Sequence, residues 1–308
     1  MSAVRWVDSE TLLEDFGFSR AIAAISEVLE SGYDPEIDHS RSVINFAEGQ
    51  GLVMPSEYMD RVGLKIVTVA PNNPASGLDR IQGIYTLFDA QTLSPILQCD
   101  GATLTLLRTA SVTAAIVKKL LSSHKPSVAL FGSGPQAFAH MRALAASTGV
   151  GKISLFARNP ESSQRLVADL TAQGFDISIG SANDLLSADL VLTLTTSREP
   201  LFEESQVSPT AVIAALGSHE ATARELPGEL MGSGVVYIES TKSALTEAGD
   251  VIMAIDEGHI EEADLVKIRQ LFSSTGPNEF SGRKVFKSTG MSWQDLAVVR
   301  ALEKSLAL

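Results

Sequence analysis

The sequence of 308 residues predicts an α/β protein in which a doubly wound parallel sheet is joined to a discontinuous α+β domain. Three observations support this fold class. A glycine-rich turn near residue 132 lies between an apolar run and a helical pattern. From there to residue 238, short apolar runs alternate with helical patterns, as in a parallel sheet. Before residue 100 the strands instead follow one another through tight turns, which is typical of an antiparallel sheet.

The first hundred residues predict two helices followed by five strands. Gly17 separates two helical patterns, and the second of them carries a buried apolar stripe. Five short apolar runs come next, bounded by turn sequences such as Glu48-Gly-Gln-Gly51. The predicted helices are Ser9–Phe16 and Ser19–Ser31, and the predicted strands are Arg41–Phe46, Leu52–Pro55, Leu64–Val69, Gly83–Phe88 and Pro95–Cys99.

The glycine-rich turn has the order of elements that binds a dinucleotide. The apolar run Val128–Phe131 is short enough for one buried strand, and the turn that follows has the pattern G-x-G-x-x-A before a helix. Gly132 permits a tight turn, and Gly134 leaves room for a pyrophosphate. The alternative is a glycine turn in an ordinary strand–helix unit. The predicted cofactor-binding residues of this loop are Gly132, Gly134, Pro135, Gln136 and Ala137.

The end of the next strand bears on the choice of cofactor. In an NAD enzyme an acidic residue at this position usually binds the ribose 2′-hydroxyl. Here the predicted strand Lys152–Arg158 ends in Arg158-Asn159, and a guanidinium suits a 2′-phosphate. We therefore favour NADP(H) over NAD(H), with Arg158 and Asn159 as cofactor contacts. The alternative is that Arg158 is an ordinary solvated residue at a strand end.

Further strands complete a sheet of the Rossmann type. They are predicted at Phe175–Ile179, Ala188–Leu194, Ala211–Leu216 and Val235–Ile238. Doubly wound sheets bind ligands beyond the carboxyl ends of their strands. Thr195, Thr196 and Gly217 follow such ends, so we expect them to contact the cofactor.

Two helical patterns set the expected domain limits. One at Leu104–Leu121 leads out of the antiparallel region, and another at Trp293–Leu306 comes after the last predicted strand. The chain is therefore expected to return to its first domain after about residue 284. The predicted limits are residues 1–116 and 286–308 for the discontinuous domain, and residues 117–285 for the Rossmann-type domain.

The composition excludes several classes of function. The net charge of −13 argues against a nucleic-acid or membrane-surface binder, although local arginines still permit an anionic substrate. A single cysteine, Cys99, excludes an intrachain disulfide, and no two histidines have metal-ligand spacing, so we expect no metal. There is no signal-peptide pattern and no run of ~20 apolar residues. We therefore expect a cytoplasmic protein.

Three basic residues lie in places that are otherwise apolar or tightly folded. Lys65 is inside a predicted strand, Arg41 opens another, and Arg108 lies near a helix start. A partly desolvated lysine has a lowered pKa and can transfer a proton, and two neighbouring arginines can hold a carboxylate. The alternatives are a strand lysine that faces solvent, a solvated arginine at a sheet edge and a surface ion pair.

His219 is a fourth candidate, in the segment Gly217-Ser-His-Glu220. It follows the carboxyl end of a predicted strand, where an imidazole beside a nicotinamide would be able to donate or accept a proton. The alternative is a loop histidine without a catalytic role.

Together these features resemble the ornithine cyclodeaminase/mu-crystallin family, over nearly the whole chain. The ordered set of motifs is far more specific than any one of them. It comprises Arg41, Met54-Pro55, Lys65-Ile-Val, Pro71-Asn-Asn-Pro74, Asp100-Gly101, Thr105-x-x-Arg108-Thr109-Ala110, the Gly132–Ala137 loop, and Val285–Met291 with Asp295 beyond it.

The resemblance implies a nucleotide-binding domain and a substrate domain built from both chain ends, which makes a homodimer through a shared β barrel. It also implies roles for individual residues. Arg41 and Arg108 would bind a substrate carboxylate, and Lys65 would act as acid or base at the amino or imino nitrogen. Thr109, Thr195, Gly217 and Ser288 would lie along the cofactor.

One departure from the family pattern guides the choice of activity. Cyclodeaminases and the related archaeal alanine dehydrogenases carry an acidic residue where this chain has His219. Our leading hypothesis is therefore an NAD(P)H-dependent reductase of 2-imino acids, such as the cyclic ketimine 1-pyrroline-2-carboxylate, or an amino-acid dehydrogenase. One alternative is ornithine cyclodeaminase, a lyase that yields proline and ammonia. Another is a mu-crystallin-like protein that binds NADPH and a small ligand with little turnover.

Overall fold

A computed structural model describes residues 4–122, 124–273 and 282–307. The chain forms two compact units. The first comprises Met1–Val28, Ile37–Val112 and Met291–Leu308, and the second comprises Leu29–Glu36 and Thr113–Gly290. The main segment of the second unit runs from Thr113 to Gly290, against predicted limits of 117 and 285, and the unit also takes in Leu29–Glu36, which the sequence analysis places in the discontinuous domain. The assignment of substrate binding to one unit and cofactor binding to the other stays a prediction.

The first unit is built on a six-stranded sheet with the order β1-β6-β5-β4-β3-β2. All neighbouring strands are antiparallel except β1 and β6, which are parallel. The five predicted strands are present, and the three-residue strand β1 was not predicted. The strands are β1 (Arg5–Val7), β2 (Ser42–Phe46), β3 (Gly49–Tyr58), β4 (Arg61–Val69), β5 (Ile81–Asp89) and β6 (Pro95–Asp100).

The two faces of this sheet differ in their surroundings. Helix α9 (Ser292–Ser305) lies against β3, β4 and β5. The cross-strand row Lys65, Tyr85 and Cys99 is buried, whereas the adjacent row contains Ile66 and Ile84, which are 43% and 40% exposed. Because side chains alternate between faces, one face belongs to the core and the other exposes apolar side chains among the residues that the structure describes.

The helices of the first region follow the predicted pattern with shifted ends. Residues Thr11–Phe16 form a wide π-type turn, η1, which ends at Gly17, at φ +74°, the first residue of α1 (Gly17–Glu30). Helix α2 (Gly101–Leu120) starts three residues before the predicted start at Leu104. The Asp100 carboxylate accepts a hydrogen bond of 2.7 Å from the Thr103 amide and so caps the beginning of α2.

The second unit contains an eight-stranded, all-parallel sheet with the order β13-β12-β14-β11-β10-β7-β8-β9. The order reverses between β7 and β10, which confirms the predicted doubly wound sheet. Every residue of β7, β10 and β11 is buried, as their apolar runs require. The strands are β7 (Val128–Phe131), β8 (Ile153–Phe156), β9 (Ile177–Ile179), β10 (Leu190–Thr193), β11 (Val212–Ala215), β12 (Gly234–Ile238), β13 (Val266–Lys267) and β14 (Arg283–Lys287).

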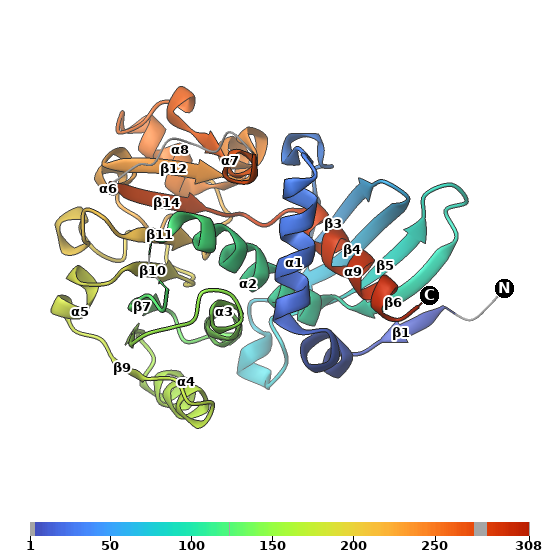
Figure 1. Ribbon diagram of the computed structural model, residues 1–308, viewed down its shortest axis with the longest axis horizontal. Coiled ribbons are helices and arrows are strands. Elements are labelled where there is room, and N and C mark those ends of the chain that lie inside the picture. The colour runs from blue at the N-terminus through green and yellow to red at the C-terminus, as the bar shows by residue number, and fades with distance from the viewer. Residues whose placement is uncertain (1–3, 123, 274–281, 308) are drawn as a thin grey trace. The chain divides into compact units, whose positions relative to one another are not determined.

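Helices connect the strands of the second unit (Figure 1). They are α3 (Pro135–Ala145), α4 (Pro160–Ala172), α5 (Ala182–Leu186), α6 (Gly228–Gly232), α7 (Thr241–Glu247) and α8 (Gly249–Asp256). Short 3₁₀ turns are η2 (Pro35–Ile37), η3 (Asn73–Ser76), η4 (Glu204–Gln206), η5 (Glu262–Asp264) and η6 (Ile268–Phe272). None of the helices within the described residues combines the length and apolar content needed to cross a bilayer.

Strand β14 was not predicted from the sequence. It lies between β11 and β12, in red among yellow and orange strands in Figure 1. Its sequence, Arg283-Lys-Val-Phe-Lys287, contains three cations and therefore lacks an apolar run. Arg283 and Lys287 are nevertheless buried, and they form ion pairs with Glu204 and Asp250. The predicted domain limit at residues 285 and 286 therefore falls inside a strand.

Candidate active site

Three elements of the first unit bring a buried ion-pair cluster together. Lys65 on β4 is 1% exposed, and its Nζ lies 2.7 Å from Oδ2 of Asp295 on α9. The same ammonium donates hydrogen bonds to Asp295 Oδ1 at 2.9 Å and to Thr105 Oγ1 on α2 at 3.2 Å. The structure thus excludes the alternative of a strand lysine that faces solvent.

Arg108 joins this cluster from α2. Its Nη1 donates to Gln294 Oε1 at 2.6 Å, and its Nε lies 3.4 Å from Asp295 Oδ1. Arg108 is 6% exposed, so it is not the surface ion pair that was the alternative. Two adjacent residues of α9 therefore hold its guanidinium.

The electrostatics of the cluster favour an anionic ligand. Burial, together with the positive charges of Arg108 and Arg41, lowers the pKa of Lys65 to about 8, against the attraction of Asp295. Arg41, partly exposed directly before β2, thus acts on Lys65 through its charge. Three cations and one buried carboxylate leave a local excess of positive charge in a chain whose net charge is −13.

The remaining predicted site residues lie mostly at one edge of the parallel sheet in the second unit. Parallel strands end at the same edge, so the segments that follow β14, β11, β10, β7 and β8 are neighbours in that order. Thr109 is the exception, since it belongs to α2 in the first unit. The residues at the edge are Ser288, Gly217, His219, Thr195, Thr196, the loop Gly132–Ala137, Arg158 and Asn159.

The Gly132–Ala137 loop has the geometry of a phosphate cradle. Gly132 has φ +108°, and a Cβ there would lie 2.6 Å from the Leu194 carbonyl oxygen, so only glycine fits. A Cβ on Gly134 would meet no atom within 4 Å, which leaves open space at the start of α3. Pro135 is the first residue of that helix, and Ala137 in its first turn is fully buried. The loop fits a pyrophosphate at a helix N-terminus.

Arg158 and Asn159 play different parts beyond β8. Arg158 is exposed, whereas the Asn159 side chain accepts a hydrogen bond of 3.1 Å from the Ser162 amide and caps α4. The structure thus gives Asn159 a local structural role that the sequence reasoning did not include.

A buried carboxylate that was not predicted joins the ends of β10 and β11. Glu225 is fully buried and accepts hydrogen bonds from the Thr193 hydroxyl at 2.8 Å and the Gly217 amide at 2.7 Å. It also accepts from the amide and the hydroxyl of Thr195, at 2.8 and 2.7 Å. Two of the predicted cofactor residues are therefore held by one side chain.

A second layer supports Glu225. Asp250 accepts hydrogen bonds from the Glu225 and Leu226 amides, at 2.7 and 2.9 Å, and lies 2.8 Å from Lys287 Nζ. Lys287 in turn donates to the Ser218 carbonyl oxygen at 2.7 Å. Glu225 lies in a loop without helical or strand periodicity, so no pattern in the sequence marked it.

Two other predicted residues differ in their exposure. Ser288 is buried, and its hydroxyl donates a hydrogen bond of 2.9 Å to Glu239 Oε1. His219 is exposed in the loop after β11. Within the described ranges, no group of three or more His, Cys, Asp or Glu side chains is arranged to hold a metal ion.

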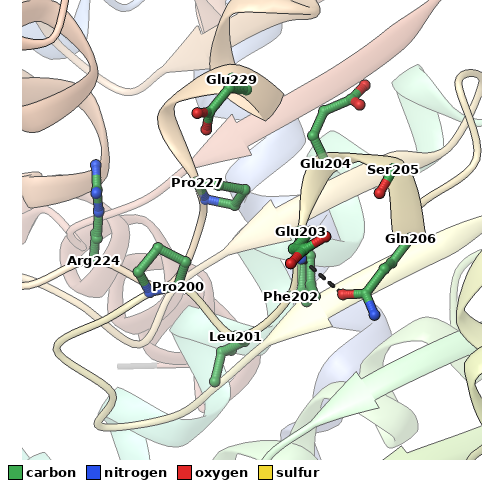
Figure 2. A pocket seen from close by; sticks show the side chains of 10 residues that line it. All are labelled: Pro200, Leu201, Phe202, Glu203, Glu204, Ser205, Gln206, Arg224, Pro227 and Glu229. Carbon is green, nitrogen blue, oxygen red and sulfur yellow. Dashed lines mark hydrogen bonds between the residues drawn. The ribbon is translucent and has the colours of Figure 1, made fainter.

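A pocket of about 670 Å³ in the second unit is lined by none of the predicted site residues (Figure 2). Glu203, Glu204 and Glu229 are among its lining side chains, and Arg224, the cation in its wall, pairs with Glu257 at 2.7 Å. Its carboxylates would repel the carboxylate of an amino or imino acid. The pocket is lined by Pro200, Leu201, Phe202, Glu203, Glu204, Ser205, Gln206, Arg224, Pro227 and Glu229.

Comparisons with known proteins identify the family and the fold of the chain. A profile of the ornithine cyclodeaminase/mu-crystallin family matches residues 11–307. A Delta(1)-pyrroline-2-carboxylate reductase of Bacillus cereus is 31% identical over 274 residues, which cover 85% of this chain and 84% of that protein.

Two solved structures share the fold. One is Thermococcus litoralis Delta(1)-pyrroline-2-carboxylate reductase in complex with NADH and L-proline, with a TM-score of 0.90, 22% identity, and coverage of 99% of this chain and 98% of that one. The other is an archaeal alanine dehydrogenase dimer with bound NAD, with a TM-score of 0.88, 23% identity, and coverage of 99% and 97%. The chain belongs to the ornithine cyclodeaminase/mu-crystallin family.

Proposed function

We propose that this protein is an NAD(P)H-dependent reductase of 2-imino acids, with a cyclic ketimine such as 1-pyrroline-2-carboxylate as substrate. The observation that carries the proposal is the buried Lys65 with Arg108 beside it, in a chain 31% identical to a pyrroline-2-carboxylate reductase. A buried amine with a pKa of about 8 is mostly protonated at neutral pH and is suited to donate a proton to an imine nitrogen.

The two arginines and the lysine have different parts in the proposed reaction. Arg41 and Arg108 bind the substrate carboxylate and so orient the prochiral carbon. Lys65 gives its proton to the imine nitrogen, which makes C2 electrophilic. A bound nicotinamide would supply the hydride for C2, and with the proton from Lys65 the C=N bond would become a C–N single bond. His219 remains a candidate for proton exchange with solvent, because it is exposed.

The proposed cofactor is NADP(H) in preference to NAD(H). The Gly132–Ala137 loop would hold the pyrophosphate, and the exposed Arg158 beyond β8 would pair with a 2′-phosphate. Thr109, Thr195, Thr196, Gly217 and Ser288 are proposed along the rest of the cofactor. A reaction that consumes reduced nicotinamide is consistent with a cytoplasmic location.

Replacement of Arg158 tests the cofactor preference. We expect Arg158→Ala to raise the Kd for NADPH by about tenfold while the Kd for NADH changes by less than about twofold, since one charge-assisted contact is lost. Titration of cofactor fluorescence measures both constants. Arg165→Ala on α4, a residue 73% exposed and paired within its own helix, is the matched control. An unchanged ratio of the two constants would refute the preference.

Turnover tests the proposed activity. NADPH and NADH are compared in an absorbance assay with cyclic and linear 2-imino acids, and we expect oxidation of the cofactor with the cyclic ketimines. Proline and ammonia formed from ornithine without added reductant would instead support a cyclodeaminase. Retained NADPH binding without oxidation by any imino acid would support a binding protein.

We also propose that the protein is a homodimer. The face of the first sheet that carries Ile66 and Ile84 presents large, exposed apolar side chains on β2, β4 and β5. Ile44 is 46% exposed and Phe46 58% exposed, beside Ile66 and Ile84. An apolar patch across a sheet face is typical of a protein interface, and a second copy of the same face would cover it.

A further inference from the structure

The proposed reaction leaves one buried acidic residue of the cluster without a role. Asp295 is fully buried in the first turn of α9, where the helix dipole stabilises a carboxylate. Its Oδ2 lies 2.7 Å from Lys65 Nζ, and its Oδ1 lies 2.9 Å from the same Nζ and 3.4 Å from Arg108 Nε. One carboxylate thus bridges the two buried cations.

We propose that Asp295 is a positioning residue that fixes the Lys65 ammonium and the Arg108 guanidinium and keeps the proton on Lys65. This inference rests on the proposed reductase function and deepens it. Neighbouring Gln294 holds Arg108 Nη1 at 2.6 Å, so the start of α9 sets the orientation of the guanidinium at two of its nitrogens.

The charges around Lys65 explain why this carboxylate matters. Arg108 on α2 and Arg41 before β2 both repel the ammonium. Burial raises the pKa of Tyr85 on β5 and of Cys99 on β6, so both are neutral near pH 7. Among these groups, Asp295 alone attracts the ammonium. Without it, desolvation and two positive neighbours would remove the proton from Lys65 at neutral pH.

The test is the pH profile of kcat/KM for Asp295→Asn. In the wild type we expect activity to fall as Lys65 loses its proton, and in D295N we expect this alkaline limb to move by about one pH unit or more to lower pH. The Kd for NADPH should change by less than about twofold, because no proposed cofactor contact is altered. Ionisation of the substrate is common to both proteins and cancels in the comparison.

A purely structural role predicts a different result. Activity of D295N would then fall by the same factor at every pH, and the alkaline limb would stay at its wild-type pH. This outcome would overturn the inference. Glu303→Gln is the control, because Glu303 is on the same helix but binds Arg61, at 2.7 Å. We expect its limb to stay at the wild-type position.

Two further measurements keep the inference testable. If D295N does not fold, Asp295→Glu is the second variant, because it retains the negative charge but shifts the position of the Lys65 ammonium. We expect kcat/KM to fall about tenfold, with the alkaline limb of the pH profile unmoved. A limb displaced to lower pH in D295E would contradict the inference. If the wild type reduces no imino acid, the proposed function is wrong. NMR titration of lysine labelled at its ε carbon still measures whether D295N lowers the pKa of Lys65.

Discussion

At Lys65, burial and charge act in opposite directions. Removing an ammonium from water costs several kcal/mol, and the ion pair with Asp295 at 2.7 Å offsets that cost only in part, since the pKa of Lys65 falls to about 8. At pH 7 about 90% of such a group carries its proton. The residue therefore combines a nearly full charge with a proton that is easier to donate than that of an ordinary lysine.

Replacement of Lys65 should separate catalysis from cofactor binding. We expect Lys65→Met, which retains most of the side-chain volume, to lower kcat by about 10²- to 10⁴-fold because the proton donor is lost. The Kd for NADPH should remain within about twofold of the wild-type value. Steady-state kinetics and a fluorescence titration measure the two effects. Equal losses in turnover and cofactor affinity would argue against a catalytic role for Lys65.

His140 should make stability depend on pH. It is fully buried in α3, with Nδ1 2.7 Å from the Gln136 carbonyl oxygen, and burial lowers its pKa to about 4. The unfolded chain, with an ordinary pKa near 6.5, binds this proton first. The neutral imidazole therefore contributes full stability above pH 6.5, and about 3 kcal/mol of it is lost as the pH falls towards 4.

Urea unfolding at pH 7 and pH 4.5 measures this dependence. In His140→Gln the difference in unfolding free energy between the two values should be smaller than in the wild type. The titration of the carboxylates is common to both proteins. An identical difference in the variant would show that His140 does not titrate on unfolding.

Residue type and position in the predicted elements marked Arg41, Lys65 and Arg108 as candidates, because these cations lie in places that are otherwise apolar or tightly folded. Their partners were harder to find. Asp295 appeared in the sequence only as part of a family pattern, since the contact with Lys65 joins residues 230 positions apart. No sequence pattern marked Glu225. It lies in a loop, and its hydrogen-bond donors, Thr193 and Gly217, are at the ends of strands that precede that loop in the sequence.

At the scale of elements, the same reasoning located the strands of the second sheet except β13 and β14. Apolar runs identify β7, β10 and β11 because these strands are buried on both sides. Strand β14 is equally internal, yet Arg283 and Lys287 are neutralised by partners that are distant in sequence, Glu204 of η4 and Asp250 of α8. The two-residue strand β13 is too short for any periodicity. Periodicity therefore detects strands whose burial is apolar, and misses those whose burial depends on ion pairs.

The loops after β10 and β11 should depend on Glu225. In a glutamine at this position one carboxylate oxygen is replaced by an NH2 group, which cannot accept the hydrogen bonds that this oxygen now accepts. A buried donor left without an acceptor costs about 1–3 kcal/mol. We expect Glu225→Gln to raise the Kd for NADPH by about tenfold, because Thr195 and Gly217 would no longer be held together. Calorimetric titration measures the change.

A matched control separates this effect from a general loss of stability. Glu203→Gln, at an exposed position in the wall of the acidic pocket, should leave the Kd unchanged. A Glu225→Gln protein that melts at a lower temperature but binds NADPH as the wild type does would contradict the prediction.

At the scale of the whole molecule, the apolar sheet face predicts self-association. We expect Ile66→Asp, at a position 43% exposed in the centre of this face, to shift the protein from dimer to monomer in sedimentation velocity. A charge buried without a partner in an interface costs several kcal/mol. Leu186→Asp on α5, a residue 50% exposed in the other unit, is the control. A wild type that sediments as a monomer would exclude the proposed dimer.

The bridge between Lys65 and Asp295 also has a consequence for biosynthesis. At about 5–20 residues per second, a ribosome needs roughly 10–50 s to pass from one partner to the other, which lie 230 positions apart. During that interval the emerging chain holds its cations without their shared counter-ion, so the amino-terminal sheet gains little by closing over them. Because Asp295 belongs to α9, we expect a variant that lacks Ser292–Ser305 to leave this sheet open to proteases.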